Sequence, residues 1–404
     1  MSNIIEKWGI AMPVLSNRVQ TFTESVIRGT TRIANQYNAI NLSQGFPDFH
    51  PPQELLDALQ RVAIDGPHQY ATTWGAQNFR EALAEKQSRA MGVDIDPNTD
   101  IVVTCGSTEA MMVAMMTTCN PGDKVIVFSP FYENYAADAI LSGAEPIYVS
   151  LYPPTFTFDI EELRKAFEQR PKALVLCNPS NPSGKVFTKE ELQVIADFAE
   201  EYDVYVITDE VYEHIVFEPH EHVYFASLPE MYKRTLSCSS LSKTYSITGW
   251  RLGYVIAPAQ IIEQARKVHD FLTVGAAAPL QEAAITGLKL PDSYYADLRT
   301  IYTTKRDSFL RGLDHAGLSY VPPQGTYFVM VDISKLGIAD DQQFTEWMIK
   351  EVGVAPVPGS AFFREPVKHL IRFHFAKSQP ILEQAIGRLA DIQHKIQAYK
   401  GATL

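Results

Sequence analysis

The chain is long enough for two domains and carries an excess of acidic residues. Its 404 residues include 35 basic and 47 acidic side chains, for a net charge of −12, and 46% of the residues are hydrophobic. A single hydrophobic core rarely serves a chain of this length, so we expect two domains. The acidic excess disfavours nucleic acid and anionic membranes as partners.

Cysteine usage and the apolar segments favour a cytoplasmic protein. The cysteines are far apart in the sequence and form no CxxC pair, so neither a metal site nor a disulfide framework is indicated. Free thiols in a chain of this size are typical of the reducing cytosol. We find no segment with the length and apolar character of a signal peptide or a transmembrane helix. The cysteines are Cys105, Cys119, Cys177 and Cys238.

The first two thirds of the chain alternate short apolar strands with amphipathic helices. Residues 1–40 are expected to form an arm with a short helix, and helices are predicted at 51–64 and 76–90. This alternation is typical of a mainly parallel sheet covered by helices on both faces. Strands are predicted at 101–104, 124–128, 147–149, 173–177, 204–208 and 252–256, and helices at 108–118, 132–141, 160–167 and 189–201.

The character of the sequence changes near residue 292, where a smaller α+β domain is predicted. We expect a large domain at 46–290 and a small domain built from 1–45 and 291–404. The elements predicted in this last part are a helix at 292–313, a strand at 327–331, a helix at 341–351, a strand at 370–375 and a helix from 380 to about 399.

Lys243 lies in the most informative stretch, SLSKTYSITGWRLG at residues 240–253. A lysine amine that condenses with an aldehyde forms a Schiff base, the covalent device of enzymes that use pyridoxal 5'-phosphate (PLP). Ser240 and Arg251 would then supply a hydroxyl and a guanidinium to the phosphate of that cofactor. The alternative is a loop lysine among ordinary turn residues, and it would prevail for an isolated Ser-x-x-Lys.

Two further motifs follow predicted strands, at the sheet edge where ligands of open parallel sheets gather. Gly106 allows close backbone approach, and the amides of Ser107 and Thr108 would point at an anion from a helix N-terminus. Ordinary helix capping would also explain these hydroxyls. Asp209 ends an apolar strand, where a carboxylate is costly unless it is paired. A protonated pyridine nitrogen would be such a partner, and a helix N-cap is the alternative.

Arg372 lies between apolar neighbours on a predicted strand. A buried arginine needs an anionic partner. The α-carboxylate of a substrate suits the planar guanidinium, which binds carboxylates with two parallel hydrogen bonds. A structural ion pair is the alternative for this residue.

The extended string around Lys243 resembles the cofactor-lysine signature of class I and II aminotransferases, which are fold-type I PLP enzymes. The motifs follow the family's order from about residue 41 to residue 372. The resemblance implies the family's α/β fold, with a mainly parallel seven-stranded sheet between helices and a smaller α+β domain. It also implies PLP as cofactor, an amino acid and a 2-oxo acid as substrates, a ping-pong mechanism and a homodimer.

The resemblance assigns roles to residues whose own patterns leave them open. Asn181, in the turn NPSNPSG at 178–184, and Tyr212 match residues that bind the oxygen on the cofactor ring. Tyr132 matches the aromatic residue that stacks on the ring. A rigid turn is the alternative for Asn181, and an aromatic helix start packed in the core is the alternative for Tyr132. Gly45 matches a loop whose backbone amide helps to bind the substrate carboxylate. Tyr70 matches a tyrosine that reaches the phosphate of the neighbouring subunit.

In the resembled mechanism, Lys243 is both the covalent anchor and the general base that removes the α-proton. Asp209 keeps the ring nitrogen protonated, Tyr212 contacts the ring oxygen, and Arg372 holds the carboxylate together with Asn181 and Gly45. No metal takes part.

Two segments resemble the branch that contains kynurenine, glutamine and methionine aminotransferases: QGFPDF at 44–49 and VPGSAF at 357–362. They favour a neutral donor such as methionine, glutamine or an aromatic amino acid. The branch's histidine near the substrate is not found, because TVGA occupies 273–276. A PLP-dependent β-lyase or cyclase on the same scaffold stays open, since fold does not fix reaction type. A non-catalytic PLP-binding regulatory domain is disfavoured, since no basic DNA-binding module accompanies the motifs.

Overall fold

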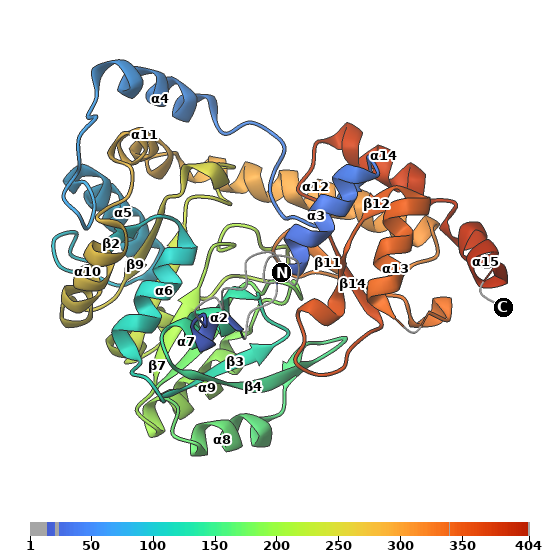
Figure 1. The fold of residues 1–404 in the computed structure, drawn as a ribbon. Helices are drawn as coiled ribbons and strands as arrows, with labels where there is room; N and C mark the ends of the chain where they lie inside the picture. Colours follow the sequence, from blue (N-terminus) through green and yellow to red (C-terminus); the bar gives the residue numbers. More distant parts are fainter. Residues whose placement is uncertain (1–13, 21–23, 339, 403–404) are drawn as a thin grey trace, which may run out of the picture.

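The computed structural model describes residues 14–20, 24–338 and 340–402. A large mixed sheet among helices makes up one part of the molecule, and a four-stranded sheet with its own helices makes up the other (Figure 1). The expected N-terminal arm falls partly on residues 1–13 and 21–23, which lie outside the described residues. No helix in the described ranges is long and apolar enough to cross a membrane.

The large sheet has the strand order β2-β9-β8-β7-β6-β3-β4-β5. The neighbours from β8 to β4 run parallel, whereas β9 runs antiparallel to both of its neighbours and β5 runs antiparallel to β4. The mainly parallel sheet is therefore confirmed. It has eight strands where seven were expected, because the two-residue β5 adds one more strand beside β4. The strands are β2 (Ile101–Thr104), β3 (Lys124–Ser129), β4 (Glu145–Tyr152), β5 (Thr157–Phe158), β6 (Ala173–Cys177), β7 (Tyr205–Asp209), β8 (Thr235–Ser240) and β9 (Gly253–Ile256).

Helices cover both faces of this sheet because successive side chains of a strand point to opposite faces. Ile126 and Phe128 of β3 pack in one apolar cluster with α8 and α9, whereas Val125 and Val127 pack in another with α6 and α10. The helices of this part are α4 (Gln53–Asp65), α5 (Gln77–Met91), α6 (Ser107–Thr118), α7 (Asn134–Leu141), α8 (Ile160–Glu168), α9 (Lys189–Glu201), α10 (Ala259–Thr273) and α11 (Ala278–Leu288).

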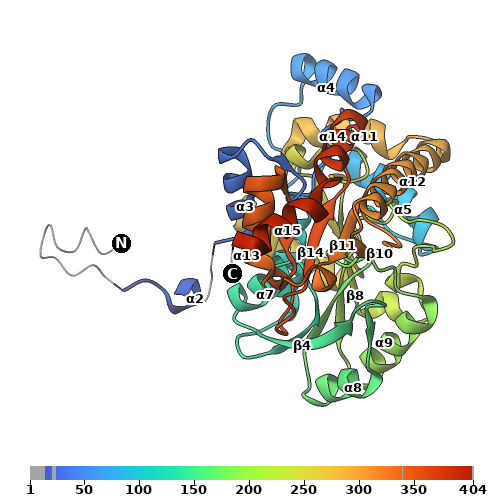
Figure 2. The same ribbon diagram turned by 90° about the vertical axis from the view of Figure 1, so that its right-hand side faces the viewer.

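The C-terminal part is an antiparallel sheet of order β10-β11-β14-β13 with helices packed on it (Figure 2). The helix predicted from 380 to about 399 is two helices, and the apolar pattern continues across the break because Ile392 and Ile396 are both buried. The elements are α12 (Asp292–His315), β10 (Ser319–Val321), β11 (Phe328–Asp332), α13 (Asp341–Trp347), β13 (Val357–Pro358), β14 (Leu370–His374), α14 (Gln379–Leu389) and α15 (Ile392–Ala402).

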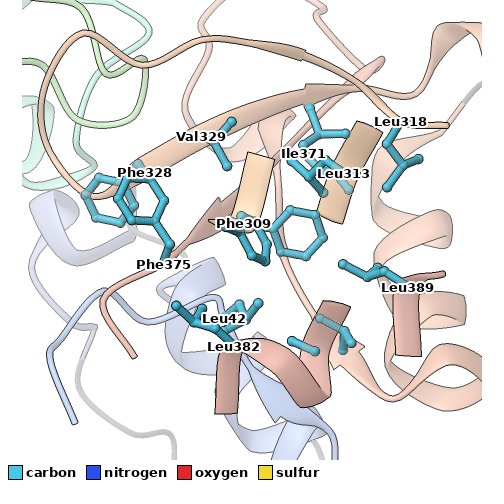
Figure 3. Packing of buried hydrophobic residues seen from close by; sticks show 14 of the residues in the cluster. Leu42, Phe309, Leu313, Leu318, Phe328, Val329, Ile371, Phe375, Leu382 and Leu389 are labelled. Atoms are coloured by element: carbon cyan, nitrogen blue, oxygen red, sulfur yellow. The ribbon is translucent and has the colours of Figure 1, made fainter. Parts of the chain in front are cut away.

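The N-terminal residues that the structure describes lie against this C-terminal part. The two-residue strand β1 (Ile40–Asn41) pairs in parallel with β12 (Val354–Ala355), and α3 (Val26–Gln36) lies beside it (Figure 1). Leu42 enters the apolar core between α12, α14 and the sheet, where Phe309 and Leu382 are fully buried (Figure 3). The segment around Leu42 and the strand β14 are thus packed in one core.

Candidate active site

The carboxyl ends of β6, β7 and β8 and the loops beside them bring the predicted residues together. Lys243 lies in the turn after β8, and its Nζ donates a hydrogen bond to the backbone oxygen of Gly45 at 3.5 Å. The same Nζ lies 6.0 Å from the ring centre of Tyr212 and 5.9 Å from that of Tyr327. The Tyr294 hydroxyl donates to the carbonyl of Thr244 at 2.7 Å, which fixes the turn next to the lysine.

Asp209 is a buried carboxylate at the end of β7. Its Oδ2 accepts a hydrogen bond from the Tyr135 hydroxyl at 2.7 Å, and its Oδ1 accepts a long one from the Val211 amide at 3.4 Å. Burial raises the pKa of Asp209 above its ordinary value, although the Tyr135 hydroxyl, the Val211 amide and the charge of Lys243 act in the opposite direction. The helix N-cap alternative is wrong, because no helix begins between Asp209 and Phe225.

Arg372 is 1% exposed and has hydrogen bonds to neutral groups. Its Nη1 donates to Oδ1 of Asn181 at 2.6 Å, and its Nη2 donates to the Ser43 carbonyl at 2.8 Å. Its Nε has no hydrogen-bond partner, and within the described residues no carboxylate lies within 4.0 Å of the guanidinium. Burial lowers the pKa of Arg372 to about 10. Arg372 therefore forms no structural ion pair within the described residues, so that alternative is excluded there. An anionic ligand would supply the negative charge that a buried guanidinium needs.

Two aromatic rings enclose the Arg372 guanidinium. Its carbon lies 4.0 Å from the ring centre of Phe328 and 4.5 Å from that of Phe362. Cation–π contacts of this kind hold a guanidinium in a fixed plane while they exclude water. A fixed, dry guanidinium suits recognition of a planar carboxylate.

A second cradle for an anion forms where α6 begins. Gly106 has a φ of +85°, and a Cβ there would lie 2.2 Å from Nη2 of Arg251. Ser107 and Thr108 open the helix, whose first amides have no partner within the helix. Ser240 ends β8 directly opposite Gly253, so its hydroxyl belongs to the same region. Free amides at a helix N-terminus, hydroxyls and a guanidinium form a group that binds phosphate.

The remaining predicted residues are Tyr132, Gly45 and Tyr70, and their places relative to the cluster around Lys243 differ. Tyr132 lies edge-on to Tyr135 with the ring centres 5.8 Å apart, and burial raises its pKa to about 12. The carbonyl of Gly45 accepts from Lys243 and from Tyr327, the latter at 2.8 Å, whereas the prediction gave the role to its amide. A Cβ on Gly45 would lie 2.6 Å from the Phe328 ring, so the loop approaches β11 closely. Tyr70 is 86% exposed on the protein surface.

Sequence reasoning missed two residues of this cluster, Tyr135 and Tyr327. Tyr135 lies three residues after Tyr132, and its amide donates to the Tyr132 carbonyl at 3.0 Å in the turn where α7 begins. This short spacing is the available signal for it. Tyr327 follows Gly325 and Thr326 at the start of a strand, and its sequence neighbours carry no comparable signal.

Comparison with known proteins identifies the family. Residues 37–389 match the family model described as aminotransferase class I and II. This chain belongs to the class I and II aminotransferases. Enzymes of this family are PLP-dependent, so the protein is a PLP-dependent aminotransferase.

Among curated proteins, this aminotransferase is 39% identical to a methionine aminotransferase of Escherichia coli K12, over 89% of this chain and 94% of that protein. It is 35% identical to kynurenine–oxoglutarate transaminase 1 of Homo sapiens, over 87% of this chain and 92% of that protein. None of these comparisons supports the β-lyase or cyclase alternative.

Solved structures give the same result. The E. coli structure described as having a methionine aminotransferase function has a TM-score of 0.91 and 37% identity, and covers 94% of this chain and 100% of that one. The N-succinyldiaminopimelate aminotransferase of Mycobacterium tuberculosis has a TM-score of 0.90 and 36% identity, and covers 93% of this chain and 99% of that one. The fold-type I architecture is confirmed.

The residues present fit PLP on the evidence of their own geometry. The α6 N-terminus, Ser240 and Arg251 offer donors to a phosphate, and the close packing at Gly106 shows that the guanidinium is held there. Asp209 offers a buried carboxylate to a protonated ring nitrogen, and Lys243 an amine to an aldehyde. Arg372, with an unpartnered Nε, offers a separate anion site for a substrate.

Proposed function

We propose that this aminotransferase moves the α-amino group of a neutral L-amino acid, such as methionine, glutamine or an aromatic amino acid, to a 2-oxo acid by a ping-pong mechanism. The observation that carries this proposal is Arg372, a buried guanidinium without a carboxylate partner in the described residues. It suits an α-carboxylate, while the rings of Phe328, Phe362 and Tyr132 suit an uncharged side chain. The relatives named for methionine and kynurenine support the same class of donor.

Each residue of the cluster then has a task. Bound PLP supplies an aldehyde that condenses with an amine and a protonated ring nitrogen that accepts electrons. Lys243 is the anchoring amine and, once displaced, takes the proton from the substrate α-carbon. Asp209, whose carboxylate is oriented by the Tyr135 hydroxyl, would hold the proton on the ring nitrogen.

The other cofactor contacts orient the ring. Asn181 and Tyr212 would bind the oxygen of the ring, and Tyr132 would supply an aromatic surface for its face. Asn181 also accepts a hydrogen bond from Arg372, so one side chain joins the cofactor contacts to the carboxylate site. Ser107, Thr108, Ser240 and Arg251 would hold the phosphate, together with Tyr70 of a second subunit.

A homodimer is part of this proposal. Tyr70 is 86% exposed and Phe271 is 91% exposed. The His269 ring contacts the Thr73 carbonyl at 2.9 Å, which brings the segments of both aromatic residues to the same side of the molecule. Exposed aromatic residues gathered in this way are typical of an interface.

The dimer can be tested by subunit exchange between the inactive variants Tyr70→Ala and Lys243→Ala. If Tyr70 serves the neighbouring subunit, a mixed dimer has one site with both defects and one with neither, so activity returns in part. A monomer by sedimentation, or no recovery after proven exchange, would contradict the proposal.

We further infer a large domain at 46–290, a small domain from 1–45 with 291–404, and a cytoplasmic location. The apolar cluster around Phe309 and Phe373, which draws mainly on residues after 291 and on Leu42, supports the division. The unpaired cysteines, all free thiols, support a reducing compartment.

A panel of donors tests the substrate class. Methionine, glutamine, phenylalanine, kynurenine and aspartate would each be mixed with PLP-loaded enzyme and one 2-oxo acid. We expect kcat/KM for the best neutral donor to exceed that for aspartate by more than about tenfold, because a second carboxylate among aromatic rings is left without a partner. A higher kcat/KM for aspartate would contradict the proposal.

A further inference from the structure

Two serines at the edge of the large sheet bind one carboxylate from the C-terminal part. Ser129 of β3 and Ser150 of β4 are register partners at the carboxyl end of the parallel pair. The Ser129 hydroxyl donates to Oε2 of Glu365 at 2.6 Å, and the Ser150 hydroxyl donates to Oε1 at 2.8 Å. We call Glu365, Ser129 and Ser150 the Glu365 clasp.

The segment that carries Glu365 also carries a wall of the Arg372 site. It runs between β13 and β14 and includes Phe362, whose ring centre lies 4.5 Å from the guanidinium carbon. The Phe362 carbonyl accepts a hydrogen bond from the Phe131 amide at 3.0 Å. The Arg364 amide donates to the Ser129 hydroxyl at 2.9 Å, so Ser129 binds this segment twice.

The two hydrogen bonds of the Glu365 clasp are of a strong kind and join the segment of Glu365 to the large sheet. Hydrogen bonds from hydroxyls to an ionised carboxylate are short and stronger than those between neutral groups. Within the described residues no lysine, arginine or histidine lies within 4.0 Å of Glu365. The two serine hydroxyls are therefore its side-chain partners, and Ser129 itself is fully buried.

We propose that Glu365 is a positioning residue that holds Phe362 against Arg372 and thereby sets the affinity of the substrate-carboxylate site. The proposal rests on the proposed role of Arg372. Without the clasp, the segment moves away from the sheet, water reaches the guanidinium, and its attraction for a carboxylate weakens in the higher dielectric. The change affects amino acids and 2-oxo acids alike, because both present a carboxylate. None of the proposed phosphate contacts belongs to the clasp, so cofactor affinity stays the same.

The test is carboxylate binding to PLP-loaded protein, with 3-phenylpropanoate as the probe and calorimetry as the readout. We expect Glu365→Ala to raise the dissociation constant about tenfold, which corresponds to about 1.4 kcal/mol. Glu365→Gln, which keeps the shape and one acceptor, should fall between Glu365→Ala and the wild type. In steady-state kinetics, KM for donor and acceptor should rise while kcat stays within about twofold of the wild type. Lys368→Ala, at an exposed position in the same segment, is the matched control and should bind as the wild type does.

Arg372→Ala, measured beside these variants, separates the two claims. If the wild type does not bind the probe, or if Arg372→Ala binds it equally well, the carboxylate assignment of Arg372 fails. If Arg372→Ala loses binding and folded Glu365→Ala does not, the clasp proposal is overturned; a fall in kcat with unchanged affinity overturns it too. Should Glu365→Ala not fold, Ser150→Ala removes one of the two bonds and should weaken binding about threefold. Unchanged binding in that variant overturns the proposal.

Discussion

Asp209 and Arg372 are both buried, yet each has hydrogen bonds to neutral groups of the chain. Tyr135 and the Val211 amide serve Asp209, and Asn181 and the Ser43 carbonyl serve Arg372. A protein keeps such charges apart from each other at a cost in stability, because each buried charge prefers an opposite partner. The two side chains are therefore suited to bind opposite charges on ligands, and we propose the ring nitrogen of PLP for Asp209 and the substrate carboxylate for Arg372.

Tyr135→Phe tests how Asp209 is tuned. The change removes the hydroxyl that donates to Asp209, so the pKa of the carboxyl should rise further. We expect removal of the substrate α-proton to slow about tenfold, because a lost hydrogen bond to a charged group is worth about 1.5–3 kcal/mol. The acid limb of the pH–rate profile should move to higher pH. Exchange of the α-proton for deuterium, followed by NMR, measures the rate.

Tyr132→Phe is the matched control for this experiment. It deletes a neighbouring hydroxyl but leaves the ring that packs edge-on to Tyr135. An unchanged exchange rate in Tyr135→Phe would mean that the tyrosine packs beside Asp209 without tuning it.

At the level of elements, most strands of the large sheet could be predicted from apolar runs in the sequence, whereas a strand with a polar sequence could not. Five of the six strands predicted for the large sheet were near their observed positions, and the sixth, at 147–149, is longer, Glu145–Tyr152. The strand β8 was not predicted, because its sequence TLSCSS is mostly hydroxyls although every residue in it is buried. The Thr235 hydroxyl donates to the Met231 carbonyl and the Ser240 hydroxyl accepts from the Ser242 amide, whereas those of Ser237 and Ser239 have no hydrogen-bond partner in the described residues. The burial of this strand comes from its place at the centre of the sheet, which a single sequence does not reveal.

The same limit applies to the site. Lys243, Asp209 and Arg372 stand in unusual local sequence and could be predicted from it. Tyr327 contacts Gly45 across a sequence separation of 282 residues, so its role emerges only from the fold. The Glu365 clasp likewise joins positions more than two hundred residues apart.

Gly106→Ala tests the cradle at the start of α6. The new Cβ would lie 2.2 Å from Nη2 of Arg251, so the guanidinium must move. We expect the dissociation constant for PLP to rise at least about tenfold, since a charged hydrogen-bond donor to the phosphate is displaced. Equilibrium dialysis of the refilled apo-protein measures it.

Gly122→Ala is the control that separates backbone strain from displacement of the Arg251 guanidinium. Its φ of +90° imposes a similar backbone cost, but no atom lies within 4 Å of its new Cβ. Equal loss of PLP affinity in both variants would show that general destabilisation, and not the position of Arg251, explains the effect.

Across the whole molecule, several histidines are buried in neutral form. Burial lowers the pKa of His222 to about 4, and burial together with Lys86 lowers that of His214 to about 3. The pKa of His374 beside Arg372 also falls well below its ordinary value, chiefly through burial. The unfolded chain binds protons at these sites more readily than the folded protein does, so stability is complete above about pH 6.5 and falls as the pH decreases toward 4.

His222→Phe should therefore reduce the acid sensitivity of the fold. For a histidine with a folded pKa of about 4, the free energy of unfolding falls by about 2 kcal/mol between pH 6.5 and pH 5. We expect the thermal midpoint of the variant to fall less than that of the wild type over this interval. His394→Phe, at an exposed position, should follow the wild type. Equal losses in all three proteins would show that His222 does not stay neutral in the folded state.

The central claim is that this chain transfers an amino group through PLP held by Lys243. The most direct measurement mixes PLP-loaded enzyme with its best neutral donor in the absence of any 2-oxo acid. We predict the release of about one 2-oxo acid per active site and no ammonia, with further turnover after a 2-oxo acid is added. Lys243→Ala should release none. Continuous release of ammonia without an acceptor, or normal turnover in Lys243→Ala, would contradict the account.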